Sequence, residues 1–245
     1  MTYEFISSER YTDTSTKLTF LLNGRQTIVV RPDTPAKGNP TVWRAEFFGA
    51  FDSVDRAMLE RGWFIVYHSV SNMYGCPESI VMMREFYDFM EQTFNLSKKP
   101  VLFGFSRGAL YSVNYAVKYP DAVGAMYLDA PCLSNHYWPG SDKYDGTAEQ
   151  MLLFKWLGIT KAEVATYPGY PKDRAHLVKD IPIIIVQGDA DVECVWEEHG
   201  KYFVDKLEAA GGKAEIIFKP GCGHHPHSLD DPTPVVEFIE KNYKA

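Results

Sequence analysis

Short apolar runs alternate with longer amphipathic stretches along most of this chain. Residues 17–32 contain two apolar runs on either side of Asn23-Gly24, a dipeptide that favours the two-residue turn of a β-hairpin. After this expected amino-terminal hairpin, runs rich in β-branched and aromatic residues alternate with stretches of helical length. Such alternation is typical of βαβ units, so we expect an α/β fold with a mostly parallel central sheet and helices on both of its faces.

The same pattern predicts the individual elements. Strands are expected at residues 41–48, 63–70, 100–105, 123–130, 181–187 and 215–219, and helices at 53–61, 78–94, 107–118, 196–211 and 233–243. Residues 131–180 depart from the alternation, and we interpret them as a small cap-like insertion. No interior stretch has the composition of a linker, so residues 1–245 are predicted to form one domain.

Composition narrows the classes of partner. Hydrophobic residues make up 45% of the chain, enough for a sizeable core, yet no apolar run approaches the roughly 18 residues that a membrane span requires. The net charge is −7 and the lysines and arginines are scattered, which argues against a nucleic-acid partner. We therefore expect a soluble protein that binds neither membranes nor nucleic acids. Its oligomeric state is not indicated.

The cysteines and the first residues bear on the cellular compartment. The four cysteines have no CxxC spacing, so we expect free thiols rather than a zinc knuckle or a redox pair. The first ten residues lack the basic and apolar regions of a signal peptide. The chain as given therefore suggests a cytoplasmic protein, or a periplasmic or secreted one if a leader has been removed.

A serine stands between two glycines at the end of one predicted strand. Gly104-Phe105-Ser106-Arg107-Gly108 fits the G-x-S-x-G pattern of a nucleophile elbow and lies between a predicted strand and a predicted helix, as that pattern requires. The glycines leave room for a sharp turn that exposes the serine hydroxyl. The alternative interpretation is an ordinary strand-to-helix turn.

Acidic residues and histidines follow the later predicted strands. Because the carboxyl ends of parallel strands meet at one edge of a sheet, these side chains should lie near the serine. A serine hydroxyl is a poor nucleophile until an imidazole takes its proton, and a carboxylate must orient that imidazole. The chain offers Asp191, Asp189 or Asp129 as the acid and His224 or His225 as the base.

The order of serine, acid and histidine, each after a strand, resembles the α/β-hydrolase family from about Trp43 to the carboxyl terminus. In that family the acid commonly ends a G-x-x-D segment and the base ends a G-x-G-H segment. The resemblance implies the α/β-hydrolase fold, with Ser106 as nucleophile, Asp191 as acid and His224 as base. His227 is expected to brace its loop through hydrogen bonds.

A tetrahedral intermediate requires preorganised hydrogen-bond donors. The first expected donor is the backbone N–H of Arg107, which follows the nucleophile. The second should follow the predicted strand 41–48, where relatives often carry a His-Gly pair that this chain lacks. We place it at the backbone of Glu46 or Phe47.

Several further side chains are expected around a substrate. Arg44, Glu46 and Arg107 could bind a polar, even acidic, substrate or could form structural ion pairs. Tyr74 and Trp138 could supply flat faces for a sugar ring or could simply pack in the interior.

The histidines of residues 224–227 invite a metal interpretation. Nothing nearby in the sequence offers the spaced carboxylates or thiolates of a zinc site, so we expect no metal and no cofactor.

Three segments sharpen the resemblance: "WRAEFFGAF", "GFSRGAL" and "GHHPHSLDDPTPVVEFI" are similar to bacterial α/β-hydrolases of the prolyl-oligopeptidase-like and acetyl-esterase-like kind. The resemblance implies a serine esterase with a small-molecule or saccharide ester as substrate, such as an acetyl or methyl ester of a carbohydrate. A lactonase, a small peptidase and a non-catalytic binding protein on the same scaffold are the alternatives.

Overall fold

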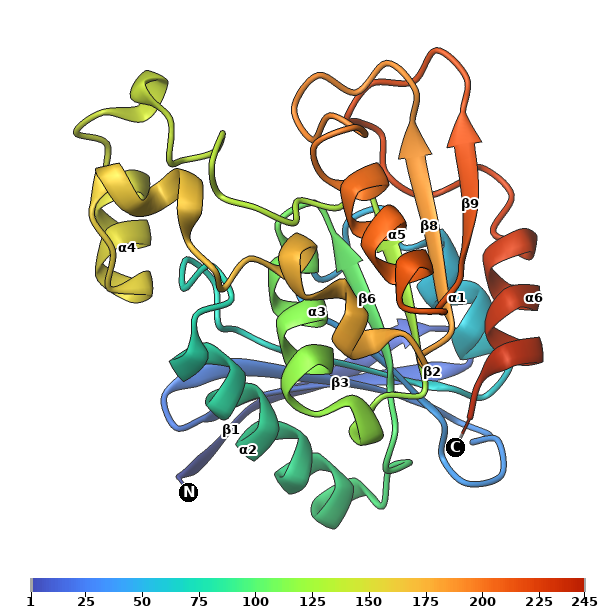
Figure 1. Cartoon of the computed structure of the whole chain (residues 1–245). Coiled ribbons are helices and arrows are strands. Elements are labelled where there is room, and N and C mark those ends of the chain that lie inside the picture. The colour runs from blue at the N-terminus through green and yellow to red at the C-terminus, as the bar shows by residue number, and fades with distance from the viewer. Residues whose placement is uncertain (1, 245) are drawn as a thin grey trace.

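The computed structural model describes residues 2–244. Within this range nine strands form one sheet in the order β1-β2-β3-β5-β4-β6-β7-β8-β9 (Figure 1). The strands from β4 onward run parallel to one another, whereas β1, β2 and β3 are joined antiparallel and β3 pairs antiparallel with β5. The predicted mostly parallel sheet is confirmed.

The amino-terminal hairpin consists of β2 (Ser15–Leu22) and β3 (Arg25–Pro32). Its turn residues Asn23 and Gly24 both adopt positive φ, 50° and 74°, which is what the two-residue turn requires. A further strand, β1 (Tyr3–Thr12), pairs with β2 at the edge of the sheet and was not predicted. Most of its side chains are exposed on both faces, so it lacks the apolar alternation that reveals a half-buried strand.

The parallel strands explain the apolar runs of the sequence. Every residue is buried in β4 (Thr41–Arg44), β5 (Phe64–His68), β6 (Val101–Phe105), β7 (Ala125–Asp129) and β8 (Ile183–Gly188), whereas β9 (Ala214–Lys219) is a partly exposed edge. The predicted strand 41–48 is wrong in its second half. The chain turns after Arg44, whose guanidinium donates to the carbonyl oxygens of Phe47 and Ala50 and so holds the following residues as a loop.

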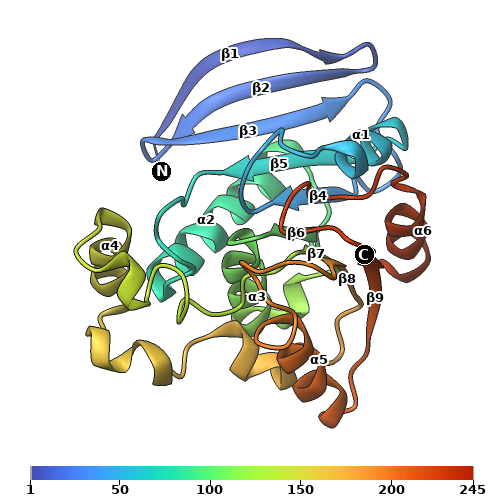
Figure 2. The same ribbon diagram turned by 90° about the horizontal axis from the view of Figure 1, so that it is seen from above.

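Helices cover both faces of the sheet, as expected (Figure 2). One face carries α1 (Ser53–Glu60) and α6 (Thr233–Asn242), and the other carries α2 (Pro77–Phe94), α3 (Gly108–Lys118) and α5 (Gly200–Ala209). Each face has its own buried apolar core between helices and sheet. The sheet is therefore a rigid platform whose carboxyl edge can hold a site.

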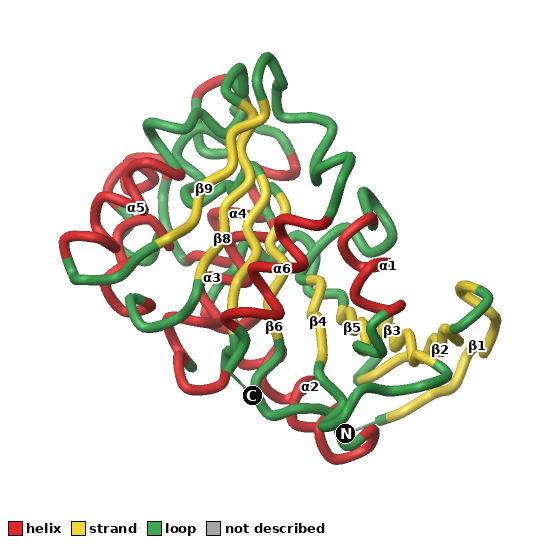
Figure 3. The backbone as a smooth tube through the Cα atoms, turned by 90° about the vertical axis from the view of Figure 1, so that its right-hand side faces the viewer, coloured by secondary structure: helices red, strands yellow, loops and turns green. Residues whose placement is uncertain are grey.

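The region between β7 and β8 holds the short helices η2 (Asp142–Tyr144), η3 (Lys161–Thr166) and η4 (Pro171–Val178) together with α4 (Ala148–Leu157). The part around α4 stands out from the body of the molecule (Figure 1). The last helix of the region between β7 and β8, η4, instead packs against α3 and α5. The loops after β8 and β9 gather above the carboxyl ends of these strands (Figure 3). Among the described residues, no helix combines the length and the apolar character that crossing a bilayer demands.

Candidate active site

The turn between β6 and α3 presents Ser106 in a strained conformation. Ser106 has φ of 49°, which a residue with a side chain seldom adopts. The turn is held because the Ser106 N–H donates to the Asp129 carbonyl oxygen at 2.9 Å and the Ser106 carbonyl oxygen accepts from the Cys132 N–H at 3.0 Å. A Cβ atom at Gly104 would lie 2.8 Å from the Ala109 Cα atom, so this position requires glycine.

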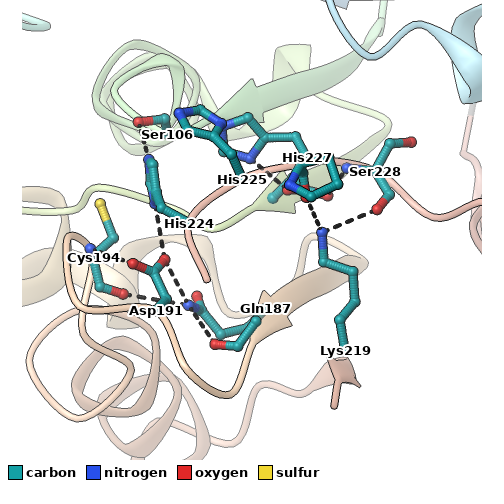
Figure 4. A network of polar contacts seen from close by, with 12 residues as sticks. Ser106, Gln187, Asp191, Cys194, Lys219, His224, His225, His227 and Ser228 are labelled. Atoms are coloured by element: carbon teal, nitrogen blue, oxygen red, sulfur yellow. Dashed lines mark hydrogen bonds and ion pairs between the residues drawn. The ribbon is translucent and has the colours of Figure 1, made fainter. Parts of the chain in front are cut away.

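Ser106, His224 and Asp191 form a continuous hydrogen-bonded chain at the carboxyl edge of the sheet (Figure 4). Ser106 Oγ lies 2.9 Å from His224 Nε2, and His224 Nδ1 lies 2.8 Å from Asp191 Oδ2. Three separate strands bring these residues together, because Ser106 follows β6, Asp191 follows β8 and His224 follows β9. The arrangement is that of a Ser-His-Asp triad.

The surroundings of Asp191 keep it ionised. Its Oδ1 accepts from the backbone N–H groups of Glu193 at 2.8 Å and Cys194 at 2.9 Å, and Gln187 Nε2 donates to Oδ2 at 3.0 Å. Burial opposes the charge, but the hydrogen bonds from His224, Cys194 and Glu193 outweigh it and lower the pKa of Asp191 to about 2. An ionised Asp191 requires a proton on His224 Nδ1, which leaves Nε2 free to accept the serine proton.

The alternative residues lie elsewhere. Asp189 is exposed and accepts from the Gly221 N–H at 2.6 Å. Asp129 is buried and binds His227, with 2.8 Å between Oδ1 and Nδ1. His225 is exposed, and its ring stacks on Phe51. None of these side chains takes part in the hydrogen-bonded chain that ends at Ser106.

The expected oxyanion donors lie around the amino terminus of α3. In residues 2–244 the Arg107 backbone N–H has no hydrogen-bond acceptor in the protein. The Glu46 backbone nitrogen lies against Gly108, 3.5 Å from where a Cβ atom would stand. Phe47 adopts φ of 57° and lines the cavity beside Ser106.

Two side chains expected to touch a substrate are buried instead. Arg44 is 0% exposed, pairs with Asp55 at 3.3 Å, and places its guanidinium 3.9 Å from the centroid of the Phe105 ring. Tyr74 is 2% exposed and donates its hydroxyl to the Glu149 carbonyl oxygen. The expectation of direct substrate contact is therefore wrong for both, because neighbouring segments cover them completely.

The Arg107 side chain faces the cavity. It lies over the rings of Phe47 and Trp138, with its guanidinium carbon 5.1 and 6.0 Å from the ring centroids. One of its nitrogens is 3.6 Å from the buried carboxylate of Glu46, and another donates to Asn72. Burial raises the pKa of Glu46, and the charge of Arg107 opposes this shift. Glu46 thus orients Arg107 and has only 3% of its own surface exposed.

A cavity of about 460 Å³ opens beside Ser106. Its walls are mainly aromatic, and residues 131–144 contribute Tyr137, Trp138 and Tyr144. Only Trp138 was predicted from this segment, although the other two rings stand close to it in the sequence.

Polar groups in the same wall include His199, which no sequence pattern singled out. Its Nδ1 accepts from the Leu133 N–H at 3.0 Å, so the proton of the neutral ring is on Nε2. Burial, followed by the charge of Lys172, lowers the pKa of His199 to about 4, and the ring is therefore neutral at pH 7.

Comparison with known proteins establishes the fold. No family model matches the chain, and no curated protein matches it. Solved structures do share the fold. Acylaminoacyl peptidase of Pyrococcus horikoshii has a TM-score of 0.69 at 16% identity, and the match covers 100% of this chain and 42% of that one. Dipeptidyl peptidase 4 of Porphyromonas gingivalis has a TM-score of 0.65 at 13% identity (89% of this chain, 33% of that one), and S-formylglutathione hydrolase of Agrobacterium tumefaciens has a TM-score of 0.62 at 17% identity (97% of this chain, 96% of that one).

The chain thus spans less than half of the two peptidases but nearly the whole of the third protein. At these identities the likeness concerns the fold. The chain has the α/β-hydrolase fold, as the sequence predicted.

Proposed function

We propose that this protein is a serine hydrolase that cleaves carboxylic esters through an acyl-enzyme on Ser106. The observation that carries the proposal is the hydrogen-bonded chain from Ser106 through His224 to Asp191, set at the edge of a cavity. A merely structural serine would have no need of a buried imidazole whose tautomer is fixed by an ionised carboxylate.

The proposed reaction has two steps. His224 Nε2 takes the Ser106 proton while Oγ attacks the ester carbonyl carbon. The backbone N–H of Arg107, with that of Glu46 or Phe47, stabilises the oxyanion. His224 then gives its proton to the departing alcohol, and a water molecule repeats the sequence to release the acid. No metal or cofactor takes part in these steps.

The walls of the cavity support a carbohydrate ester, acetyl or methyl, as substrate. Aromatic faces such as Trp138 and Tyr137 can pack on a sugar ring, and Arg107 and His199 offer hydrogen-bond donors nearby. A cavity of about 460 Å³ suits a small ester. Long acyl chains are disfavoured because polar groups interrupt the apolar wall.

A small peptidase is the second candidate. The solved structures that share the fold include an acylaminoacyl peptidase and a dipeptidyl peptidase, and a Ser-His-Asp triad can cleave amides as well as esters. A lactonase would use the same residues, and a binding protein would keep the cavity without turnover.

The test combines labelling with a substrate panel. A fluorophosphonate should label the wild type and leave Ser106→Ala unlabelled. The panel contains p-nitrophenyl acetate, butyrate and octanoate, acetylated and methyl-esterified sugars, a lactone and an aminoacyl p-nitroanilide. Turnover that favours acetate and sugar esters supports the proposal, and faster turnover of the anilide supports the peptidase. If the fluorophosphonate does not label the wild type and no substrate of the panel is hydrolysed, the non-catalytic binding protein becomes the better interpretation.

A further inference from the structure

Three imidazole rings converge next to the nucleophile. The ring centroids of His224, His225 and His227 are 4.9, 5.0 and 4.7 Å apart, and each pair of rings is close to perpendicular, at 72° to 82°. One ring nitrogen from each residue lies within 4.8 Å of the other two. Figure 4 shows these side chains beside Ser106.

Buried carboxylates orient two of the three rings. Asp191 binds His224 Nδ1 and Asp129 binds His227 Nδ1, both at 2.8 Å. Asp129 is fixed in turn by the Tyr127 hydroxyl at 2.7 Å and by the Ser228 N–H at 2.9 Å. A carboxylate that accepts from one nitrogen of a histidine, leaving the other as a ligand, is the usual support of a metal-bound imidazole.

One ring nitrogen of His227 lacks a hydrogen-bond partner in the described part of the chain. Its Nε2 is buried, and no residue from 2 to 244 offers it a hydrogen-bond partner. The residue is only 4% exposed, yet it belongs to the wall of the cavity. A buried, unpaired imidazole nitrogen is costly and indicates a ligand.

We infer that His224, His225 and His227 bind a transition-metal ion of the Zn²⁺ class, and that the bound ion switches the hydrolase off. Zinc prefers neutral imidazole ligands at about 2.0–2.1 Å and is often held by three histidines with one open position. At that bond length tetrahedral ligand nitrogens are about 3.3 Å apart, whereas the three nitrogens here lie within 4.8 Å of one another, so the rings must move closer together around the ion. His225 can make this movement because its side chain is exposed.

The sequence predicted no metal because the spaced carboxylates or thiolates of a zinc site do not stand near these histidines along the chain. The fold removes that objection, since Asp129 and Asp191 come from other strands and support the rings as second-sphere groups. Inhibition follows from the lone pair on His224 Nε2. A metal that binds this lone pair takes away the acceptor that Ser106 requires, so the inhibitory half of the inference depends on the proposed function.

The binding half is tested without any turnover. Zn²⁺ is titrated by calorimetry into Ser106→Ala, which retains all three histidines, with Mg²⁺ as the reference ion. Saturable binding of one Zn²⁺ per chain is expected, with no binding of Mg²⁺. Adding His225→Ala should weaken the Zn²⁺ affinity at least about tenfold, whereas His176→Ala, an exposed histidine on η4, should leave it unchanged. Absence of saturable binding, or equal affinity in the two variants, would overturn the inference.

The inhibitory half is tested on the wild type. Zn²⁺ should abolish both p-nitrophenyl acetate hydrolysis and fluorophosphonate labelling, and EDTA should restore them. His225→Ala, referred to its own metal-free rate, should require at least about ten times more Zn²⁺. Binding without loss of labelling would overturn the switch. Calorimetric binding with a wild type that neither labels nor turns over would instead contradict the proposed function and leave the metal site standing.

Discussion

Asp191 fixes the tautomer of His224 because hydrogen-bond donors surround both of its carboxylate oxygens. No room is left for a proton on Asp191, so His224 Nδ1 must carry one. Two backbone N–H groups satisfy one oxygen, and His224 with Gln187 satisfies the other. An amide in its place would keep the shape but would present an NH₂ group to one of these donors. The proton on the imidazole is thus controlled by the loop after β8.

Asp191→Asn tests whether this carboxylate fixes the His224 tautomer. The Asn oxygen should keep the bonds from Glu193 and Cys194, which turns its NH₂ group toward His224 Nδ1. His224 then carries its proton on Nε2 and cannot accept one from Ser106. We expect kcat to fall by about 10³- to 10⁴-fold with little change in KM, measured on the best ester of the panel.

Asp189→Asn is the matched control for this change. Asp189 stands two positions earlier in the same loop, and its carboxylate is exposed and holds only the Gly221 N–H. It should keep kcat within about threefold of the wild type. A comparable loss in both variants would show that the loop, and not the tautomer, was disturbed.

Sequence patterns predicted that Ser106, Asp191 and His224 come together, and they did not reveal that Arg44 and Tyr74 are buried, for one physical reason. Ser106, Asp191 and His224 follow strand ends, and a strand end is a local signal that a parallel sheet converts into proximity. Whether Arg44 or Tyr74 is exposed depends instead on later segments that fold over it, α1 with Asp55 in one case and residues 138–149 in the other. Burial of this kind leaves no trace in the neighbouring sequence.

The loops after β8 and β9 approach each other closely at Gly188, the last residue of β8. A Cβ atom at Gly188 would lie 2.3 Å from the Cys222 carbonyl oxygen and 2.4 Å from that of Gly223. Gly188→Ala should therefore push the two loops apart and lengthen the contact between Asp191 and His224. We expect a loss of about 1–3 kcal/mol in the free energy of unfolding and at least a tenfold lower kcat.

Gly223→Ala provides the comparison within the same pair of loops. A Cβ atom there would meet only the Ala190 carbonyl oxygen, at 3.9 Å, which is ordinary contact. Urea unfolding and steady-state kinetics measure the stability and kcat of both variants, and Gly223→Ala should stay close to the wild type in both. A Gly223→Ala variant as impaired as Gly188→Ala would mean that glycine is required for reasons other than this close approach.

The loop after β4 depends on a buried ion pair. Arg44 and Asp55 are both nearly inaccessible, and burial raises the pKa of Asp55 while the charge of Arg44 lowers it. Arg44→Leu leaves Asp55 buried without its partner and frees residues 45–50, which carry Phe47. We expect a loss of about 3–5 kcal/mol in stability by urea unfolding.

The double variant Arg44→Leu/Asp55→Leu separates charge from packing. Removing both charges should restore part of the stability lost in Arg44→Leu, because no buried carboxylate remains unpaired. Should the double variant be less stable than the single one, packing by Arg44 on Phe105 would be the larger contribution.

Element prediction succeeded where one face or both faces of an element are buried. The buried parallel strands and the helices that cover them were predicted, although α5 (Gly200–Ala209) is shorter at both ends than the predicted helix 196–211. β1 was missed because an exposed edge strand has no constraint on alternate positions. The strand 41–48 was overextended because its apolar residues continue into a loop that Arg44 holds from inside.

The burial of two histidines makes the stability of the folded protein depend on pH. His68, at the end of β5, is buried between Thr27 and Phe86, with its Nδ1 2.8 Å from Thr27 Oγ1. Burial, and then the charge of Arg25, lowers the pKa of His68 to about 4. His199 has a pKa near 4 as well, chiefly through burial. Both rings are therefore neutral in the folded protein at pH values where the unfolded chain protonates them.

This difference predicts a protein that loses stability as the pH falls below about 6.5, the pKa of an exposed histidine. Between pH 6.5 and about 4 the unfolded chain binds protons at His68 and His199 while the folded protein does not. The free energy of unfolding should then decrease with falling pH, by at most about 1.4 kcal/mol per pH unit for each histidine. Above pH 6.5 the contribution is fully present. Urea unfolding at intervals from pH 7.5 to pH 4.5 measures the slope.

His68→Gln isolates one histidine from the other titrating groups. Glutamine can still form a hydrogen bond with Thr27 Oγ1 but cannot be protonated, so the variant should be less stable at pH 7.5 and should show a shallower slope below pH 6.5. Buried carboxyls such as Glu46 and Asp55, whose pKa values are raised by burial, act equally in both proteins and cancel in the comparison. If the free energy of unfolding changed with pH equally in wild type and variant, His68 would be protonated as readily in the folded protein as in the unfolded chain. A local opening around β5 would then expose the ring to water.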